Sequence, residues 1–343
     1  MQNEKSWVAN VSGSFGDAIQ RAWYQGSNWL LPLRPLSWLV AFAARRRLKR
    51  FRKENPAPPV PILVIGNITV GGTGKTPLVV SLCEYFVKRN LKVVVISRGY
   101  RANPPHTPWL VTADQDAEQA GDEPLLIARR TNVPVIISPK RKQALDLAIK
   151  EYSPDIVISD DGLQHYELPR SAEILVLDGR RLLGNGQCLP AGPLREPASR
   201  LAEVDWLIVN GEPENEISSD SLTMKLVFAD PVNVRSGKSL HIEDFIARYP
   251  FVHGVAGIGH PDRFFSALRD QGLAVEPHPF TDHHAFSQSD LDRFGKATVL
   301  MTEKDAVKCA EIAGDNVWYV PVSAKLPTVF FEAVYEKLMR SKA

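Results

Sequence analysis

The segment TVGGTGKTP, at residues 69–77, has the residue types of a phosphate-binding loop. It follows the apolar run ILVIGNI, which we expect to be a strand, and it precedes an apolar run that we expect to be a helix. In such a loop the glycines let backbone N–H groups turn toward phosphate oxygens, Lys75 can reach the β- and γ-phosphates, and the Thr76 hydroxyl can bind Mg²⁺. The standard pattern has glycine at the position of Thr69, a departure that Gly71 and Gly72 can compensate. The alternative is a glycine-rich turn with a chance GKT. We predict nucleotide contacts from Thr69, Val70, Gly71, Gly72, Thr73, Gly74, Lys75 and Thr76.

A second group of polar residues follows the apolar run IVIS at 156–159. An acid at the end of a buried strand is where a P-loop enzyme holds its Mg²⁺-side carboxylate. Asp160 and Asp161 point to opposite faces of an extended chain, so we expect at most one of them to bind the ion directly. Gln164 and His165 come next, at the edge of the sheet that faces a ligand cleft. The alternative is a turn stabilised by capping aspartates.

Two further motifs can move protons. Asp122, in GDE at 121–123, begins a predicted helix and is either an N-cap or a catalytic acid. In FTDHHAF at 280–286 an acid stands beside His283, and such a neighbour tunes an imidazole for proton transfer. Adjacent histidines lack the spacing of zinc ligands, and the alternative is an ordinary loop. His284 and the segment TEKDAVK at 302–308 receive no predicted role.

Basic residues in loops after strands suit phosphate binding. They are Arg98, Lys140–Lys142 including Arg141, and Arg195 beside Glu196. Each of these residues, taken alone, is more often solvated than functional.

The composition describes an ordinary globular chain of about two domains. It has 343 residues, 44% hydrophobic and 23% charged, with 41 Lys+Arg against 39 Asp+Glu. Cys83, Cys188 and Cys309 are too few and too far apart for a zinc or disulfide framework, so we expect reduced thiols. The sequence begins without the pattern of a signal peptide, and it has no run of 18 apolar residues that predicts a transmembrane helix.

The N-terminal segment, residues 1–54, differs from the rest in charge and aromatic content. Residues 1–53 carry ten Lys/Arg and two Asp/Glu, and four of the seven tryptophans, Trp7 among them, fall within the first 38 residues. We expect a helix capped by Ser37, apolar at its start and polybasic at its end. Tryptophans beside a polybasic stretch favour a membrane surface over nucleic acid. The alternative is a packed helix with a solvated basic end.

The remaining elements predict an α/β fold. Near-continuous apolar strands alternate with helices from residue 55 to 215, which indicates a parallel sheet covered on both faces. We predict a kinase-like P-loop domain at 55–215, a β-hairpin linker at 216–250 and a smaller α/β domain at 251–343, completed by a helix at 328–340.

The order of these motifs resembles the tetraacyldisaccharide 4'-kinase family, the lipid A 4'-kinases of Gram-negative bacteria. The motifs that carry the resemblance are GNITVGGTGKTP, SRGYR, GDEP, ISDDGLQH, AGPLREP, GIGHPDRFF, FTDHHAF and MTEKDAVK. The resemblance implies two α/β domains joined by a β-ribbon. It also implies transfer of the γ-phosphate of ATP, with Mg²⁺, to the 4'-hydroxyl of a tetraacylated disaccharide 1-phosphate. The implied location is peripheral, on the cytoplasmic face of the inner membrane, with a lipid-linked substrate, no nucleic acid and no obligate protein partner.

The resemblance also implies a role for each candidate residue. Asp122 is the expected base and pairs with His283 of the second domain, while Asp161 is the next candidate for the base. Lys75 serves the phosphates. The implied metal ligands are Thr76, Asp160, Asp161 and Glu196, and the residues implied to line the same cleft are Arg141, Gln164, His165 and Arg195.

Two other classes of P-loop protein compete with this interpretation. A membrane GTPase switch needs a guanine-specificity motif such as NKxD, and we find none. An ATP-driven protein of cofactor or metallocentre synthesis does not need the basic, Trp-rich N-terminal segment.

The phosphate loop generates the first testable prediction. Lys75→Ala should lower phosphate transfer about 10²-fold or more, the scale of removing one preorganised charge from a transition state. The fold should persist, because the glycines determine the shape of the loop. Turnover measured on a variant with a native circular dichroism spectrum checks this, and near-normal turnover would contradict the assignment.

Overall fold

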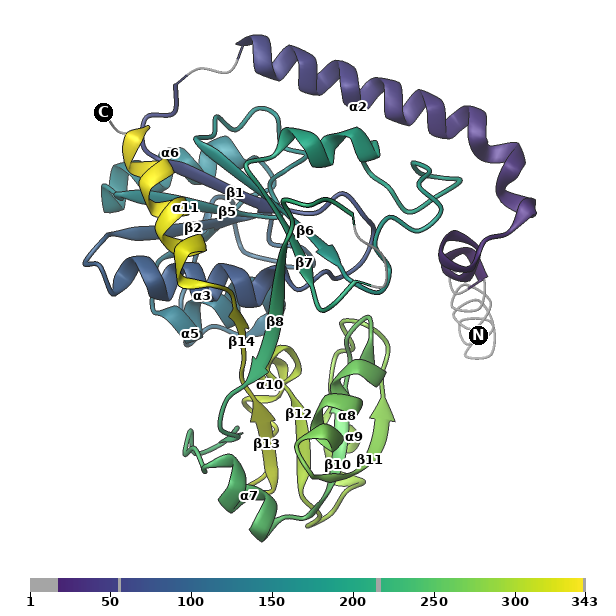
Figure 1. The fold of residues 1–343 in the computed structure, drawn as a ribbon. Helices are drawn as coiled ribbons and strands as arrows, with labels where there is room; N and C mark the ends of the chain where they lie inside the picture. The colour runs from purple at the N-terminus through teal and green to yellow at the C-terminus, as the bar shows by residue number, and fades with distance from the viewer. Residues whose placement is uncertain (1–17, 55–56, 214–216, 342–343) are drawn as a thin grey trace.

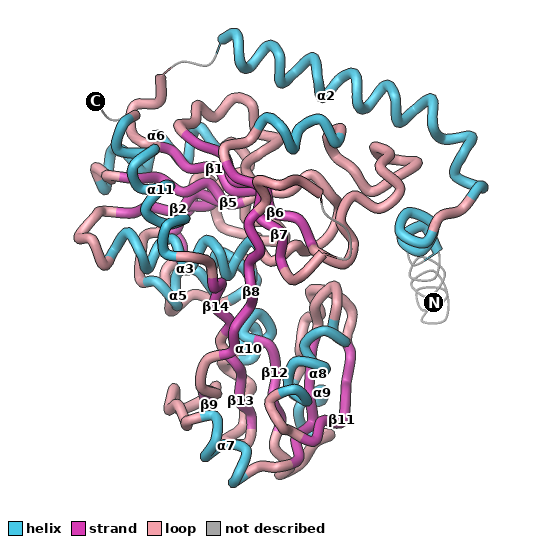
Figure 2. The backbone as a smooth tube through the Cα atoms, in the orientation of Figure 1, coloured by secondary structure: helices cyan, strands magenta, loops and turns pink. Residues whose placement is uncertain are grey.

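The computed structural model describes residues 18–54, 57–213 and 217–341, and it contains two α/β units (Figure 1). The larger unit is built on a nine-stranded sheet and the smaller on a five-stranded sheet, and the two sheets are separate in Figure 2. Trp7, included in the membrane prediction, lies outside the described residues. Cys83, Cys188 and Cys309 are buried and free.

The larger sheet has the strand order β14-β8-β7-β6-β1-β5-β2-β4-β3. Its central strands are apolar and fully buried, as expected when helices cover both faces of a parallel sheet. Only the pairs β3·β4 and β8·β14, one at each edge, are antiparallel. The strands are β1 (Ile62–Gly66), β2 (Val93–Ser97), β3 (Trp109–Val111), β4 (Val135–Ile137), β5 (Ile156–Asp160), β6 (Ala172–Asp178), β7 (Trp206–Asn210), β8 (Leu222–Phe228) and β14 (Val322–Lys325).

Helices form an apolar core on each face of this sheet. On one face α3, α5 and α11 contribute buried side chains. On the other face α6 does so, and partly buried side chains of α2 pack against this second core. The helical elements of this unit are η1 (Asn28–Leu33), α2 (Arg34–Glu54), α3 (Lys75–Val87), α4 (Ala117–Ala120), α5 (Asp122–Thr131), α6 (Arg141–Tyr152), η2 (Ala198–Glu203) and α11 (Thr328–Arg340).

The smaller sheet has the order β11-β10-β12-β13-β9, with only the short β9 antiparallel to its neighbour. Residues of α7 and α8 form one of its cores, and residues of α9 and α10 form the other. The elements are β9 (Val232–Asn233), α7 (Ile242–Arg248), β10 (Phe251–Ala256), α8 (Pro261–Asp270), β11 (Ala274–Pro279), α9 (Gln288–Asp292), β12 (Val299–Thr302), α10 (Glu303–Cys309) and β13 (Val317–Val320).

Two predicted boundaries differ from the structure. The hairpin at 216–250 is wrong, because β8 pairs with β7 and with β14, about 100 residues later, rather than with β9. The two strands β8 and β14 form the connection between the units (Figure 1). The helix at 328–340, assigned to the smaller domain, packs as α11 on the larger one, where Phe330, Val334 and Leu338 join the core. Apolar alternation identifies a strand or an amphipathic helix, but it does not specify the partner.

Helix α2 packs on the larger unit with one face and exposes apolar side chains on the other. Ser37 is not the predicted cap, because the helix begins at Arg34. Its hydroxyl instead donates to Leu33 O (3.4 Å) and accepts from Ala191 N–H (3.0 Å). Leu48, on the same face as Ser37, is also buried, whereas Trp38, Leu39 and Phe42 are 63–66% exposed. Among the residues described, no helix combines the length and apolarity needed to cross a bilayer.

Candidate active site

A cleft of about 1120 Å³ lies where the two units meet, at the carboxyl ends of the central strands. The larger unit contributes the loop after β1 and residues that end β5, β6 and β7, and the smaller unit contributes the loops after β10 and β11 and the start of α10. The lining residues that the sequence predicted are Val70, Gly71, Gly72, Thr73, Gly74, Lys75, Thr76, Arg98, Asp160, Asp161, Gln164, His165, Arg195 and His283. Six other predicted residues are not part of this lining: Thr69, Asp122, Lys140, Arg141, Lys142 and Glu196.

The phosphate loop connects β1 to α3, as predicted. Gly71 and Gly74 have φ of +99° and +86°, conformations that glycine adopts without strain. Three side chains bind carbonyl groups of the loop: Asn67 donates to Gly71 O (3.1 Å), Asn210 donates to Thr73 O (3.1 Å), and Arg181 donates to Gly72 O. Because these side chains bind carbonyl groups, they do not occupy the backbone N–H groups that bind phosphate oxygens.

The two aspartates after β5 occupy different environments. Asp161, at φ +49°, places Oδ1 3.3 Å from Lys75 Nζ and Oδ2 3.4 Å from Arg195 Nη1. Burial raises the pKa of Asp161, but Lys75 and Arg195 outweigh burial and hold it below its usual range. Asp160 is 1% exposed, and burial together with the nearby Glu123 raises its pKa to about 7.

This acidic pair fits a magnesium ion. Among the described residues, Asp160 Oδ1 is buried without a hydrogen-bond partner. A carboxylate left without donors is costly unless a cation neutralises it. Mg²⁺ prefers oxygen ligands, and the Thr76 hydroxyl at the start of α3 is a third candidate in the same cleft.

The predicted metal ligand Glu196 does not line the cleft, and its carboxylate has partners within the larger unit. Its Oε1 accepts from Gln164 Nε2 (2.6 Å), and its Oε2 accepts from the Tyr166 hydroxyl (2.6 Å) and lies 3.2 Å from Arg200 Nε. Each oxygen therefore already accepts a hydrogen bond, and Oε2 also lies beside the cationic Arg200. Glu196 instead holds Gln164, which does line the cleft.

Arg141, predicted to line the cleft, lies behind it. The buried guanidinium donates to Ser138 O (3.0 Å) and Asp160 O (3.1 Å), so it holds the backbone where β5 ends. Burial, together with the charges of Arg141 and Arg98, lowers the pKa of His165 to about 4. The imidazole of His165 is therefore neutral at pH 7.

Asp122 and His283 meet across the boundary between the units. Asp122 is the first residue of α5, and His283 lies in the loop after β11 with φ of +59°. His283 Nδ1 lies 2.9 Å from Asp122 Oδ2, and each side chain is 13% exposed. Burial raises the pKa of Asp122, but the hydrogen bond from His283 and the charges of Lys308 and Lys304 outweigh burial and lower it. Asp122 is therefore an anion that accepts a hydrogen bond from the imidazole N–H.

Two lysines of α10 complete this cluster, and sequence reasoning missed them. Lys304 Nζ lies 3.3 Å from His283 Nε2 and 3.1 Å from Glu123 Oε1, and Lys308 Nζ lies 3.9 Å from Asp122 Oδ2. An ammonium can only donate, so Nε2 accepts and the neutral imidazole carries its proton on Nδ1. The spacing of the lysines in TEKDAVK could have indicated this role. Lysines four residues apart share one helix face, so both can contact a pair of adjacent acids.

Arg263 of α8 is a second bridge between the units that the sequence did not single out. Its Nη1 lies 2.9 Å from Asp178 Oδ2, at the end of β6, and its Nη2 donates to Asn210 O (3.3 Å), at the end of β7. The guanidinium therefore links the smaller unit to the same strand ends that support the phosphate loop.

Known proteins resemble this chain over nearly its full length. Residues 29–339 match the family model LpxK, described as tetraacyldisaccharide-1-P 4'-kinase. A tetraacyldisaccharide 4'-kinase from Alcanivorax borkumensis is 54% identical over 95% of this chain and 99% of its own length. One from Pseudomonas aeruginosa is 46% identical, over 94% of this chain and 97% of its own length. A crystal structure of LpxK from Aquifex aeolicus in complex with ATP superposes with a TM-score of 0.73 at 28% identity, over 90% of this chain and 99% of that one.

The contact between Lys304 and Glu123 predicts a pH-dependent contribution to stability. Burial raises the pKa of Glu123, but the charges of Lys304 and Lys75 outweigh burial and lower it. When folding lowers the pKa of a carboxyl group, the group stabilises the fold at pH values above its unfolded-state pKa, about 4.3 for Glu. This stabilisation is lost as the pH falls through the folded-state pKa. Glu123→Gln should therefore lower the melting temperature at pH 7 by about 2–4 °C and have a smaller effect below about pH 4.

Calorimetry of both proteins at several pH values checks this. The control is Glu151→Gln, whose partner Lys150 is largely exposed, and this variant should change the melting temperature little at any pH. A Glu123→Gln effect of equal size at pH 7 and pH 3.5 would show that the loss is one of packing and not of charge.

Proposed function

Because this chain belongs to the tetraacyldisaccharide-1-P 4'-kinase family, we propose that the cleft between its units is the site of phosphate transfer. The protein is an ATP-dependent kinase that phosphorylates the 4'-hydroxyl of the tetraacyldisaccharide 1-phosphate precursor of lipid A. The match over nearly the whole chain does not favour an ATP-driven protein of cofactor or metallocentre synthesis. The observation that carries the proposed site is the Asp122–His283 contact beside a cleft that also contains the phosphate loop.

The larger unit binds the nucleotide in this proposal. The loop from Val70 to Thr76 receives the phosphates, and Lys75 and Arg195 offset their charge. Asp160, Asp161 and Thr76 would hold Mg²⁺, which would neutralise charge on the phosphate oxygens. Lys75 and Arg195 already contact Asp161, so the same side chains link the metal side of the cleft to the phosphate side.

The Asp122–His283 pair accepts the proton of the acceptor hydroxyl. A sugar hydroxyl has a pKa far above 7, so its proton must leave as the new phosphorus–oxygen bond forms. His283 lines the cleft and Asp122 lies behind it, so the imidazole meets the hydroxyl while the carboxylate orients the ring and stabilises its protonated form. Lys304 donates to Nε2 in this structure, and the hydroxyl takes its place at that atom when the acceptor binds.

The pair predicts a characteristic kinetic pattern. Asp122→Ala and His283→Ala should each lower kcat by about 10²-fold or more and change the KM for ATP little, because neither residue belongs to the phosphate loop. The double variant should lose little beyond the worse single variant, since residues that act as one unit are non-additive. The measurement is transfer of labelled phosphate from ATP, with Mg²⁺, to tetraacyldisaccharide 1-phosphate in detergent.

The outcomes separate three possibilities. Losses that multiply in the double variant would mean that the two residues act independently. Asp122 is not the N-cap of α5, which is Gly121, so a lowered melting temperature with unchanged kcat in Asp122→Ala would limit Asp122 to a structural role in the first turn of the helix. Asp161 would then become the candidate base. His284→Ala is the matched control, since its ring pairs with Asp290 (3.2 Å), and its kcat should stay close to that of the wild type.

We also propose that α2 lies flat on the cytoplasmic surface of the inner membrane. Its packed face holds it on the larger unit, and the opposite face presents Trp38, Leu39 and Phe42, followed by a polybasic end that an anionic leaflet attracts. Gln20, from the segment that precedes α2, lines the cleft. The helix proposed to face lipid therefore follows closely in sequence after a residue that lines the cleft for the lipid acceptor.

Vesicle binding tests the membrane proposal. Trp38→Gln with Phe42→Gln should weaken binding to anionic vesicles at least tenfold, because burying each side chain contributes about 1.5–3 kcal/mol. High salt should weaken binding of the wild type as well, since it screens the polybasic end. Val329→Gln is the control, because Val329 is an exposed apolar residue (69%) on α11. Equal binding of all three proteins in a sedimentation assay would favour a helix that only packs.

A further inference from the structure

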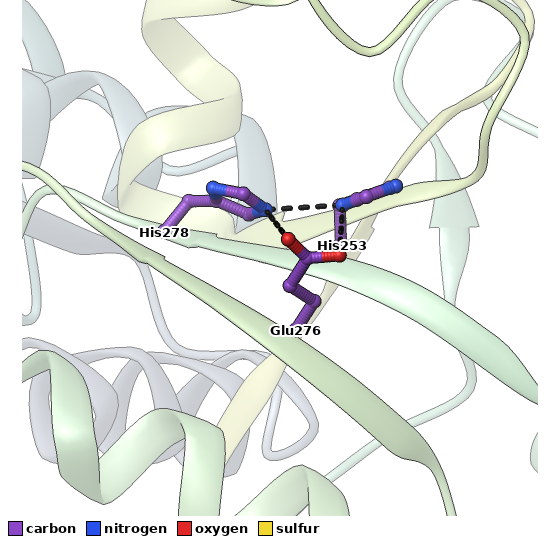
Figure 3. A group of neighbouring side chains, drawn as sticks. All are labelled: His253, Glu276 and His278. Atoms are coloured by element: carbon purple, nitrogen blue, oxygen red, sulfur yellow. Dashed lines mark hydrogen bonds and ion pairs between the residues drawn. The ribbon is translucent and has the colours of Figure 1, made fainter.

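Three side chains that the kinase mechanism does not use converge on the smaller sheet: His253, Glu276 and His278 (Figure 3). They lie on β10 and β11, and none of the three lines the cleft. All three are potential metal ligands, and one donor atom from each lies within 4.8 Å of the others. Among the described residues, these three form the one group of His, Cys, Asp or Glu side chains that is close enough to hold a metal ion.

The parallel pairing of two strands produces this cluster. In the register of β10 and β11, His253 is opposite Glu276 and Val255 is opposite His278. Residues two apart on one strand share a face of the sheet, so Glu276 and His278 project on the same side, where His253 joins them from the next strand. The cluster therefore sits on regular backbone and not on a loop.

The separations between the donor atoms match a tetrahedral metal site. His253 Nδ1 lies 3.0 Å from His278 Nε2 and 3.4 Å from Glu276 Oε2, and His278 Nε2 lies 3.8 Å from Glu276 Oε1. Zinc binds nitrogen and oxygen ligands at about 2.0–2.2 Å, and the edge of a tetrahedron with such bonds is about 3.4 Å. The two distances to Glu276 go to different carboxylate oxygens, so a rotation of this half-exposed side chain must bring one oxygen to both histidines before an ion fits between the donors.

We propose that His253, Glu276 and His278 form a binding site for a divalent zinc ion. Two imidazoles with one carboxylate are a ligand set that zinc takes in proteins, with the fourth position left for water. The histidines are 18% and 22% exposed, and the Phe294 ring lies 5.1 and 4.9 Å from their rings, so both imidazoles are held in place. Glu276 is 52% exposed and opens the site to solvent.

The close approach of the two imidazoles agrees with this assignment. Two nitrogens 3.0 Å apart share one proton when no cation is present. When His253 carries its proton on Nε2 and His278 carries its proton on Nδ1, both facing nitrogens are free to bind a metal. Arg293 is a cation that acts on His278, and its guanidinium lies 4.7 Å from the centre of the Phe294 ring.

A bound ion would stabilise the strand that leads to the catalytic loop. Strand β11 is at the edge of its sheet and pairs with β10 alone. His278 is followed five residues later by His283, the proposed proton acceptor. A zinc ion bound by residues of both strands would hold β11 against β10, and the loop that contains His283 follows β11.

Metal titration tests the proposal independently of kinase activity. The full chain, prepared without a histidine tag and freed of metal with a chelator, is titrated with Zn²⁺ in competition with a chromogenic chelator. We expect one equivalent of Zn²⁺ to bind, and Co²⁺ in its place should give the intense visible absorption of a tetrahedral site. His278→Ala and Glu276→Gln should each weaken Zn²⁺ binding by about 10–100-fold or more. Loss of a residue that only supports a ligand already has an effect of that size, and these two residues are themselves ligands.

The variants separate this site from others on the chain. Glu276→Gln changes a half-exposed side chain, so it should fold even where His278→Ala does not, and Zn²⁺ should raise the melting temperature of the wild type but not of Glu276→Gln. His241→Ala removes an exposed histidine of the same unit and should bind Zn²⁺ as the wild type does. No binding by the wild type would overturn the proposal, and so would unchanged affinity in both ligand variants.

Discussion

The carboxyl ends of the central parallel strands meet at one edge of the larger sheet, and the candidate active site depends on this constraint. The edge brings together the phosphate loop after β1, the aspartates after β5, and Asp178 and Asn210 at the ends of β6 and β7. Helices cover both faces of a parallel sheet, so this edge is where polar groups can face a ligand. The smaller unit contributes to the site only because its contacts, Arg263 and the α10 lysines, reach the same edge.

Charge is distributed unevenly around this edge. Asp161 is matched by Lys75 and Arg195, and Asp122 by His283 and Lys308, whereas Asp160 is buried beside the like-charged Glu123. Matched carboxylates remain ionised, while burial raises the pKa of the unmatched one to about 7. The environments thus give similar side chains different charge states at pH 7.

The N-terminal helix shows that two interpretations of one segment need not exclude each other. The packed-helix alternative describes the face with Ser37 and Leu48, and the membrane hypothesis concerns the opposite face with Trp38, Leu39 and Phe42. Helical periodicity places these two sets on different sides of α2. A helix attached in this way can carry an interfacial surface without spanning the bilayer.

The sequence alone predicted the α/β fold, the phosphate loop between strand and helix, and the acids at the end of β5, because these follow from local apolar patterning and the chemistry of short motifs. The Asp122–His283 pairing came from family resemblance, since no local pattern links residues 161 positions apart. Only the tertiary structure decided that β8 pairs with β14, that α11 belongs to the larger unit, that Arg141 and Glu196 lie behind the cleft, and that Lys304 contacts His283. The physical reason is that residue type and periodicity specify what a segment can bury or bind, whereas the partner that it meets depends on how distant segments pack.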